Sequence, residues 1–154
     1  MTQAFTATSA IAKKIGTQRL QRFGILYARL AIGSAFLSAV SSRFGLWDRH
    51  PDMAHFKKFL AYAASETLAF MPHSAVPLFA STATVLEIFL GITLILGLWP
   101  RWVALGSAVL LGMFAISMTI SLGIKAPMDY SVFSASAGAF LLALIQTPQQ
   151  SENA

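Results

Sequence analysis

The chain has 154 residues, of which 56% are hydrophobic and only 11% are charged, and its net charge is +5. A soluble globular domain carries about 25% charged residues because its surface must face water, so this composition excludes most soluble proteins and indicates a membrane protein. The chain has no cysteine, which excludes disulfides and thiolate metal ligands, and we interpret its basic excess as contact with anionic lipid headgroups, with no nucleic-acid partner.

The chain begins with a predicted basic tail, residues 1–22, which holds four basic residues and no acid. The first apolar stretch follows at 23–42 and is interrupted only by Arg29. Small residues recur along it at every fourth position, a spacing that lets helix backbones approach closely in lipid. We therefore predict a transmembrane helix here, with Arg43 just beyond its end.

Residues 44–77 form the one long connection that carries polar residues. Between Pro51 and Pro72 the apolar residues recur at helical spacing, with Lys57 and Lys58 off the apolar stripe. This pattern predicts an amphipathic helix that lies in the membrane interface or caps the bundle. A loop with a single helical turn is the alternative.

Three more apolar stretches complete the chain, and the sequence Trp99-Pro100-Arg101-Trp102 separates the first two of them. Aromatic and basic residues gather at membrane surfaces. We therefore expect Trp99, Arg101 and Trp102 to be interface anchors, with Tyr130 as a fourth anchor at the start of the last stretch. The predicted fold is all-α, an integral membrane four-helix bundle that covers residues 23–146. Its spans are expected at about 23–42, 78–99, 103–122 and 130–145, and a polar tail at 147–154.

An even number of spans places both termini on the same side of the membrane. Cytoplasmic segments carry an excess of Lys and Arg, but here the basic residues divide equally between the two sides. The near flanks of the first span differ, because four basic residues precede it and two follow it closely. This difference favours termini in the cytoplasm.

Two ionisable residues, Arg29 and Glu87, lie inside the predicted spans. A charge at the bilayer centre costs about 2.5–3.5 kcal/mol on insertion scales, so such residues usually face the bundle interior and have partners. Arg29 is near a helix end and could also reach the headgroups, whereas Glu87 must be paired, hydrogen-bonded or protonated. We expect Arg29 to be the partner of Glu87. Arg43 is the alternative, because helical side chains lean toward the N-terminus of their own helix.

The sequence contains little that predicts a catalytic centre. His50, His55 and His73 all lie in the long connection, and the first two are five residues apart, which is not the i, i+4 spacing of two ligands on one helical face. We therefore predict no metal site, and no haem because the four spans contain no histidine. A quinone site would need an apolar cleft with a few hydrogen-bond donors. The candidate donors are Arg29, Glu87, Trp99, Trp102 and Tyr130.

Arg29 is followed by Gly33 and Phe36, with Arg43 at the end of the same stretch. Glu87 is followed by glycines at 91 and 97 and then by Arg101 at the next turn. These two patterns together resemble the DoxX family of small bacterial four-helix membrane proteins, over about residues 23–146. The chain departs from the family pattern in its longer basic tail and its more charged first loop.

The resemblance implies the fold more strongly than the function. It implies an inner-membrane accessory subunit of a quinone-linked or oxidative-stress redox system, with quinone as a candidate ligand and no covalent cofactor. Candidate partners are the lipid bilayer, membrane or soluble redox proteins, and a second copy of the chain. A non-enzymatic scaffold or chaperone, and a lipid or small-molecule transporter or isomerase, stay open as alternatives. The candidate site residues are Arg29, Glu87 and Arg43.

Overall fold

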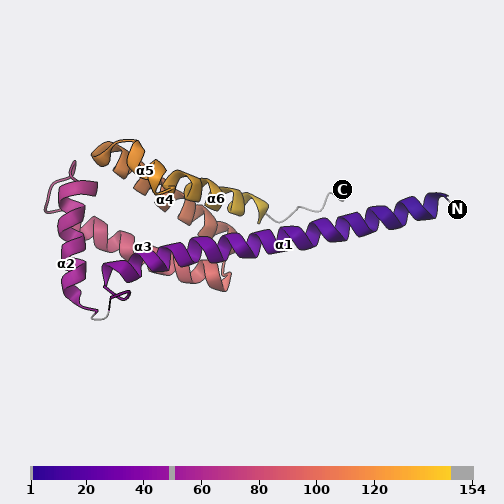
Figure 1. The fold of residues 1–154 in the computed structure, drawn as a ribbon, viewed down its shortest axis with the longest axis horizontal. Coiled ribbons are helices and arrows are strands. Elements are labelled where there is room, and N and C mark those ends of the chain that lie inside the picture. The colour runs from indigo at the N-terminus through magenta and orange to yellow at the C-terminus, as the bar shows by residue number, and fades with distance from the viewer. Residues whose placement is uncertain (1, 49–50, 147–154) are drawn as a thin grey trace.

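The computed structural model describes residues 2–48 and 51–146, and every regular element in these two ranges is a helix. The helices are α1 (Thr2–Arg43), α2 (Met53–Tyr62), the π-helix η1 (Ala63–Thr67), α3 (Val76–Leu96), α4 (Pro100–Leu122), α5 (Lys125–Asp129) and α6 (Val132–Ile145). Figure 1 shows α1, α3, α4 and α6 running alongside one another, with α2 across one end of them. The predicted all-α fold is confirmed, whereas the predicted polar tail at 147–154 lies outside the described residues.

Within the described residues, three helices are long and apolar enough to cross a membrane, namely Gly16–Arg43 of α1, Val76–Leu96 and Pro100–Leu122. The fourth predicted span is present as α6, but its 14 residues extend about 21 Å at 1.5 Å per residue. A hydrocarbon core is about 30 Å thick. The chain is therefore a multi-pass membrane protein with three full-length spans and a shorter fourth apolar helix, which follows α5 after a two-residue turn.

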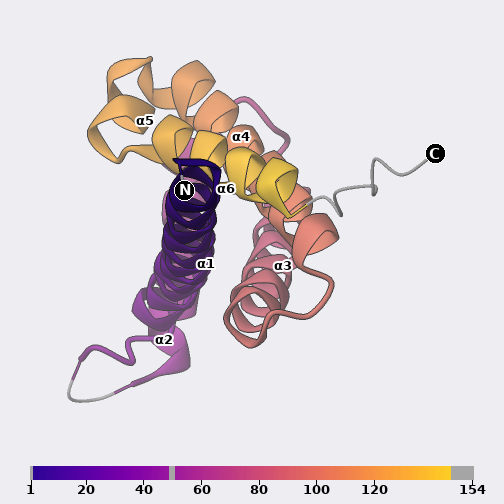
Figure 2. The ribbon, with the colours of Figure 1, turned by 90° about the vertical axis from the view of Figure 1, so that its right-hand side faces the viewer.

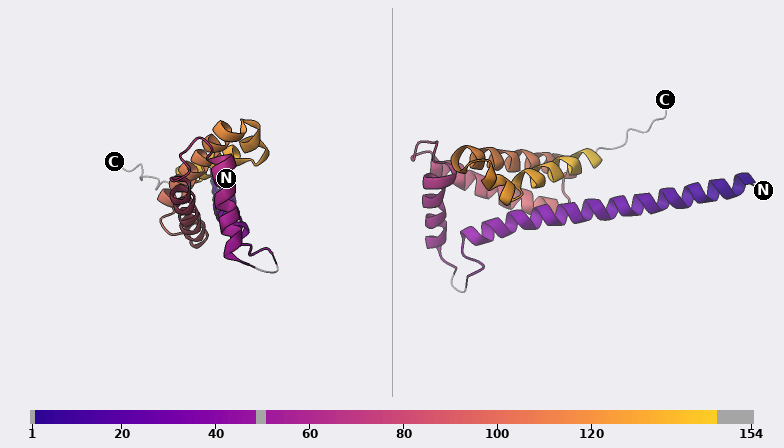
Figure 3. Two further views of the ribbon diagram at one scale, coloured as in Figure 1. Left: turned by 90° about the vertical axis from the view of Figure 1, so that its left-hand side faces the viewer. Right: turned by 45° about the horizontal axis from the view of Figure 1, so that its top comes forward.

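Helix α1 begins far earlier than the predicted start of the first span. Its 42 residues extend about 63 Å, twice the thickness of a hydrocarbon core. Residues 2–22 contain no proline and include many good helix formers such as alanine, glutamine, lysine and arginine, so nothing in them ends the helix. The N-terminal half of α1 projects beyond the end of the bundle (Figures 1 and 3).

Prolines and a glycine set the ends of the next two helices. Pro77 lies in the first turn of α3, and Gly97 ends α3 with a φ of 75°, where its N–H donates to the carbonyls of Thr93 and Leu94. Pro100 opens α4. Proline is compatible with a first helical turn because the N–H that it lacks has no partner there. As a result, α3 and α4 form a tight hairpin.

The bundle core lies where α1, α3, α4 and α6 meet, and its buried side chains are Phe36, Leu90, Leu94, Val103, Ala104, Leu110, Leu142 and Ala143. Helices α1 and α3 cross closely at Gly33 and Gly91. A Cβ atom on Gly33 would lie 2.9 Å from the carbonyl oxygen of Gly91, and one on Gly91 would lie 3.1 Å from that of Gly33. Figure 2, which looks along α1, shows α1 and α3 below α4 and α6. This crossing decides which residues of α1 and α3 face each other.

The predicted amphipathic helix is present as α2 followed directly by η1. It lies across the end of the bundle (Figure 1 and the left panel of Figure 3), and its apolar side packs against the start of α3. Phe56 of α2 stacks on Phe44, just after α1, with 5.1 Å between the ring centroids. Lys57 and Lys58 are exposed, as their position off the apolar stripe predicted.

Two serine hydroxyls of α4 fasten η1 to the bundle. Ser117 and Ser121 both donate to the carbonyl oxygen of Thr67, at 2.6 and 3.0 Å. Thr67 is the last residue of η1, so its carbonyl has no partner within the helix. Serine acts here as a polar link between helices, as it often does in membrane proteins.

Candidate functional site

Glu87 lies near the middle of α3, and only 2% of its side chain is exposed. Thr84, one turn earlier on the same face, is also buried. An ionised carboxylate in such surroundings needs hydrogen-bond partners from the protein, because burial without them is costly. The geometry around Glu87 therefore decides what this charge can do.

Arg43, the last residue of α1, supplies those partners. Its Nη1 donates to Oε2 of Glu87 and its Nη2 donates to Oε1 at 2.9 Å, so the ion pair is bidentate. Nη1 also donates to Oγ1 of Thr84 at 2.9 Å, and this hydroxyl donates to the carbonyl of Ala80. A bidentate arginine–carboxylate pair is among the strongest polar contacts that side chains make. Both carboxylate oxygens of Glu87 are thus occupied by Arg43.

Phe59 of α2 covers the other side of the guanidinium. The Cζ atom of Arg43 lies 4.5 Å from the centroid of the Phe59 ring, which is a favourable cation–π distance. Phe59 also contacts Phe56, with 5.8 Å between the centroids. The side chain of Arg43 remains 15% exposed. Residues of α1, α2 and α3 therefore meet in one cluster around the buried carboxylate.

The expectation that Arg29 pairs with Glu87 is wrong, and the alternative, Arg43, is the partner. Helical side chains lean toward the N-terminus of their own helix. Because α1 and α3 run antiparallel, this lean carries the guanidinium of Arg43 inward from the end of α1 to Glu87, and it carries that of Arg29 away. The direction of the side chains therefore decides which arginine pairs with Glu87, even though Arg29 and Glu87 differ little in their expected depth in the membrane.

Arg29 lies instead at the C-terminal end of α3. Its Nε donates to the carbonyl of Leu94 at 2.8 Å and its Nη2 donates to that of Ile95 at 3.1 Å. Carbonyls in the last turn of a helix have no partner within the helix, and a cation there is also favoured by the helix dipole. The guanidinium rests on Gly97, where a Cβ atom would lie 2.0 Å from Nη2. Arg29 thus caps α3 and is separate from the Arg43–Glu87 cluster.

The predicted interface anchors lie toward the two ends of the bundle. Trp99 and Trp102 are at the turn between α3 and α4, where the guanidinium of Arg101 lies 5.6 Å from the ring of Trp102. Tyr130 directly follows α5, the short helix beyond the other end of α4. Trp99 is 67% exposed, Trp102 70% and Tyr130 75%. These side chains do not converge with Glu87 on one cleft, and their placement at the two ends fits the aromatic belts of a membrane protein.

Of the three histidines, His50 lies outside the described residues. Nε2 of His55 pairs with Oδ2 of Asp48 at 3.0 Å, and the ring of His55 packs on Gly45, which has a φ of 66°. His73 is exposed in the turn before α3. Within the described ranges, no three His, Cys, Asp or Glu side chains are grouped as metal ligands would be. His55 therefore holds the turn between α1 and α2.

Sequence reasoning missed two members of the cluster, Thr84 and Phe59. Thr84 precedes Glu87 by three residues, a spacing that places both on one face of a helix, so this signal was available. Phe59 belongs to the apolar stripe of the predicted amphipathic helix. Which residue of that stripe covers Arg43 depends on how α2 docks, and no local pattern specifies that.

The family model described as DoxX matches residues 24–121, which is more than half of the chain. The matched range runs from the first span to the end of α4, and it contains Arg29, Arg43 and Glu87. No curated protein and no solved structure gives a match.

Proposed function

Because the chain belongs to the DoxX family, we propose that it is an accessory subunit, without catalytic activity of its own, of a redox system in the bacterial cytoplasmic membrane. One observation carries the structural part of this proposal. The charged groups inside the spans hold helices together, since Arg43 and Glu87 join α1 to α3 and Arg29 caps α3. Among the described side chains, no buried nitrogen or oxygen atom lacks a hydrogen-bond partner. Such a bundle suits a rigid support for other subunits.

The redox part of the proposal rests on the family resemblance. The chain has no cysteine and therefore no thiol to oxidise, so electrons would be carried by partner proteins or by a quinone in the bilayer. With both termini in the cytoplasm, the projecting half of α1 would extend into that compartment. Its sequence carries four basic residues and no acid between residues 1 and 22. A soluble partner could reach this segment without entering the membrane.

Purification of the tagged full-length protein from its native membranes in mild detergent tests the proposal. We expect a cofactor-bearing protein to copurify in a fixed ratio, and deletion of the gene to lower the quinone-reducing or peroxide-resisting activity of the membranes. Re-expression of the native chain should restore that activity. Mass analysis of the extracted lipids will show whether a quinone accompanies the complex.

Two outcomes would contradict the proposal. A protein that purifies alone, from membranes whose redox activities are unchanged by its deletion, would favour a scaffold or chaperone for other processes. A purified chain that by itself converts or transports a small molecule would favour a transporter or isomerase. In either case the Arg43–Glu87 contact would remain part of the fold, but the assignment of the chain to a redox complex would be wrong.

A further inference from the structure

A shallow, open groove lies at the junction of α1 and α2, beside the Arg43–Glu87 pair. Its lining residues are Ser42, Arg43, His55, Lys58, Phe59 and Tyr62, and its volume is about 380 Å³. The lining combines two cations, two hydroxyls, an imidazole and two aromatic rings. It lies at the end of the bundle that α2 crosses, which is the level of a membrane interface for an amphipathic helix. Cationic hydrogen-bond donors beside aromatic rings suit a phosphate group that is attached to a hydrocarbon chain.

Lys58 brings a positive charge to the groove, and no carboxylate among the described residues forms an ion pair with it. Arg43 is balanced by Glu87, and the carboxylate of Asp48 contacts the imidazole of His55. The side chain of Lys58 lies exposed. Arg43 has five N–H groups, of which three are used in the bonds to Glu87 and Thr84. The groove therefore offers both a free ammonium and further guanidinium donors to an anion.

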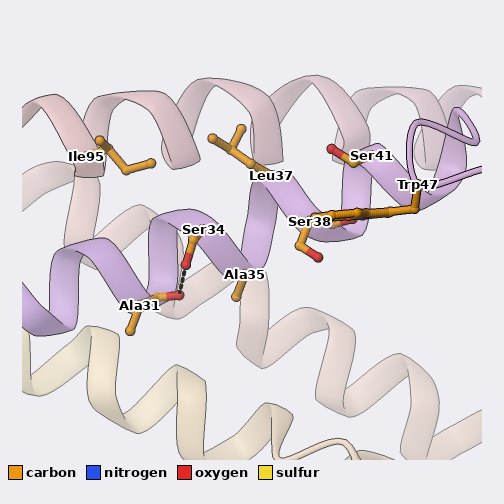
Figure 4. Close-up of a pocket in the computed structure, with 8 residues that line it drawn as sticks. All are labelled: Ala31, Ser34, Ala35, Leu37, Ser38, Ser41, Trp47 and Ile95. Carbon is orange, nitrogen blue, oxygen red and sulfur yellow. Dashed lines mark hydrogen bonds between the residues drawn. The ribbon is translucent and has the colours of Figure 1, made fainter.

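A second shallow groove lies along α1, between the first groove and the middle of the helix. It has a volume of about 430 Å³ and is lined by small residues of α1 between Ala31 and Ser41, together with Leu37, Trp47 and Ile95. Figure 4 shows the short side chains of Ala31, Ser34, Ala35 and Ser38 along α1, with Trp47 lying over Ser38. The indole Nε1 of Trp47 donates to the carbonyl of Ser38 at 3.4 Å. Ser42 of the first groove follows Ser38 of the second by four residues, and this spacing places both on the same face of α1.

We infer that the two grooves together bind one anionic phospholipid, with its phosphate at Lys58 and Arg43 and an acyl chain along the small residues of α1. A free phosphate would use the first groove only. A second copy of the chain could pack α1, α4 or α6 into the second groove, but these helices carry no carboxylate to pair with the ammonium of Lys58. A phospholipid with a net negative headgroup uses the charge of the first groove and the shallow, mostly apolar surface of the second.

Native mass spectrometry of the full-length protein in detergent tests this inference, with phosphatidylglycerol, phosphatidylcholine and inorganic phosphate as the added probes. Lys58→Gln removes the free cation, and Lys57→Gln is its matched control because Lys57 does not line the groove. Ala35→Leu fills the second groove, and Ala39→Leu is its control because Ala39 is exposed and lines neither groove. All four positions are exposed, so none of these changes should disturb folding, and thermal unfolding will verify this.

We expect one phosphatidylglycerol molecule per chain, bound more tightly than phosphatidylcholine. Lys58→Gln should weaken it by at least about ten-fold, as expected for a lost charge-assisted hydrogen bond, and Ala35→Leu should weaken it several-fold, with the controls near native. Equal losses in Lys57→Gln and Lys58→Gln would indicate diffuse surface attraction and overturn the inference. So would displacement of the lipid by inorganic phosphate, or binding that is unaffected by both Lys58→Gln and Ala35→Leu.

Discussion

Replacing Arg43 with methionine removes the partner of a carboxylate that is 2% exposed near the middle of α3. This variant loses the bidentate contact with Glu87, the bond to Thr84 and the stacking on Phe59. Glu87→Leu is the reciprocal change, which leaves the guanidinium without its acceptor. The double variant Arg43→Met/Glu87→Leu leaves no charge behind and fills a similar volume with apolar groups.

Removing one member of a buried ion pair costs about 3–5 kcal/mol in the free energy of unfolding. The upper end should apply to Arg43→Met, because Glu87 has a short side chain and is almost fully buried. The lower end should apply to Glu87→Leu, because Arg43 is 15% exposed and its long side chain can turn toward the interface. Replacing a whole buried pair with apolar residues is often nearly neutral. The coupling energy between the two positions should therefore exceed about 3 kcal/mol.

The assay is reversible unfolding in mixed micelles with increasing dodecyl sulfate, followed by loss of helical circular dichroism. The native protein, the two single variants and the double variant complete one double-mutant cycle. A second cycle pairs Arg29→Met with Glu87→Leu and should show no coupling, because Arg29 caps the far end of α3. Glu66→Gln is the control for loss of an exposed carboxylate and should change the stability by less than about 0.5 kcal/mol.

A double variant as unstable as the sum of its two single variants would refute the reasoning, because it would show that Arg43 and Glu87 do not act as a pair. Coupling of Glu87 with Arg29 that exceeds its coupling with Arg43 would also refute it. That outcome would mean that the side-chain lean used to explain the pairing does not control it.

Three further changes test the contacts that hold the other elements. Arg29→Met should cost about 2–3 kcal/mol in the same titration, because two carbonyls at the end of α3 lose a charged donor; a loss under about 0.5 kcal/mol would contradict this cap. Gly33→Ala should cost about 1–3 kcal/mol by overpacking, because its Cβ would lie 2.9 Å from a carbonyl oxygen of α3. Gly138→Ala is the control and should be neutral or stabilising, because there is open space around Gly138. Equal melting temperatures for these two variants would disprove the close crossing. The double variant Ser117→Ala/Ser121→Ala removes both donors to the last carbonyl of η1 and should speed amide hydrogen exchange in η1, at a cost of about 1–2 kcal/mol; unchanged exchange would show that the serines do not fasten it.

Much of the fold could be predicted because hydropathy and helix-ending residues act locally. The long apolar stretches, Pro77, Gly97 and Pro100 place α3 and α4 within a few residues of their observed bounds. The amphipathic pattern after Pro51 likewise predicted α2. The predicted start of α1 differed by about twenty residues, because hydropathy marks where a helix enters lipid and contains no signal for where the helix itself begins.

The residues of the candidate site could be predicted from the sequence, but the contacts between them could be predicted less well. Glu87 and Arg43 could be named because a charge beside or within an apolar span needs a reason to be there. Their pairing depends on the crossing of α1 and α3 at Gly33 and Gly91, which sets the height of one helix against the other. Arg29 was the favoured partner until that height and the direction of both arginine side chains were known.

The sequence by itself determined that this chain is helical, crosses a membrane and carries ionisable groups where lipid disfavours them, since each of these properties follows from the residue types along short segments. Only the tertiary structure decided which arginine neutralises Glu87, which one caps α3, and how Phe59 closes the cluster. The physical reason is distance: these contacts join residues that are 16 to more than 60 positions apart, and only the packing of whole helices brings them within hydrogen-bond or van der Waals reach.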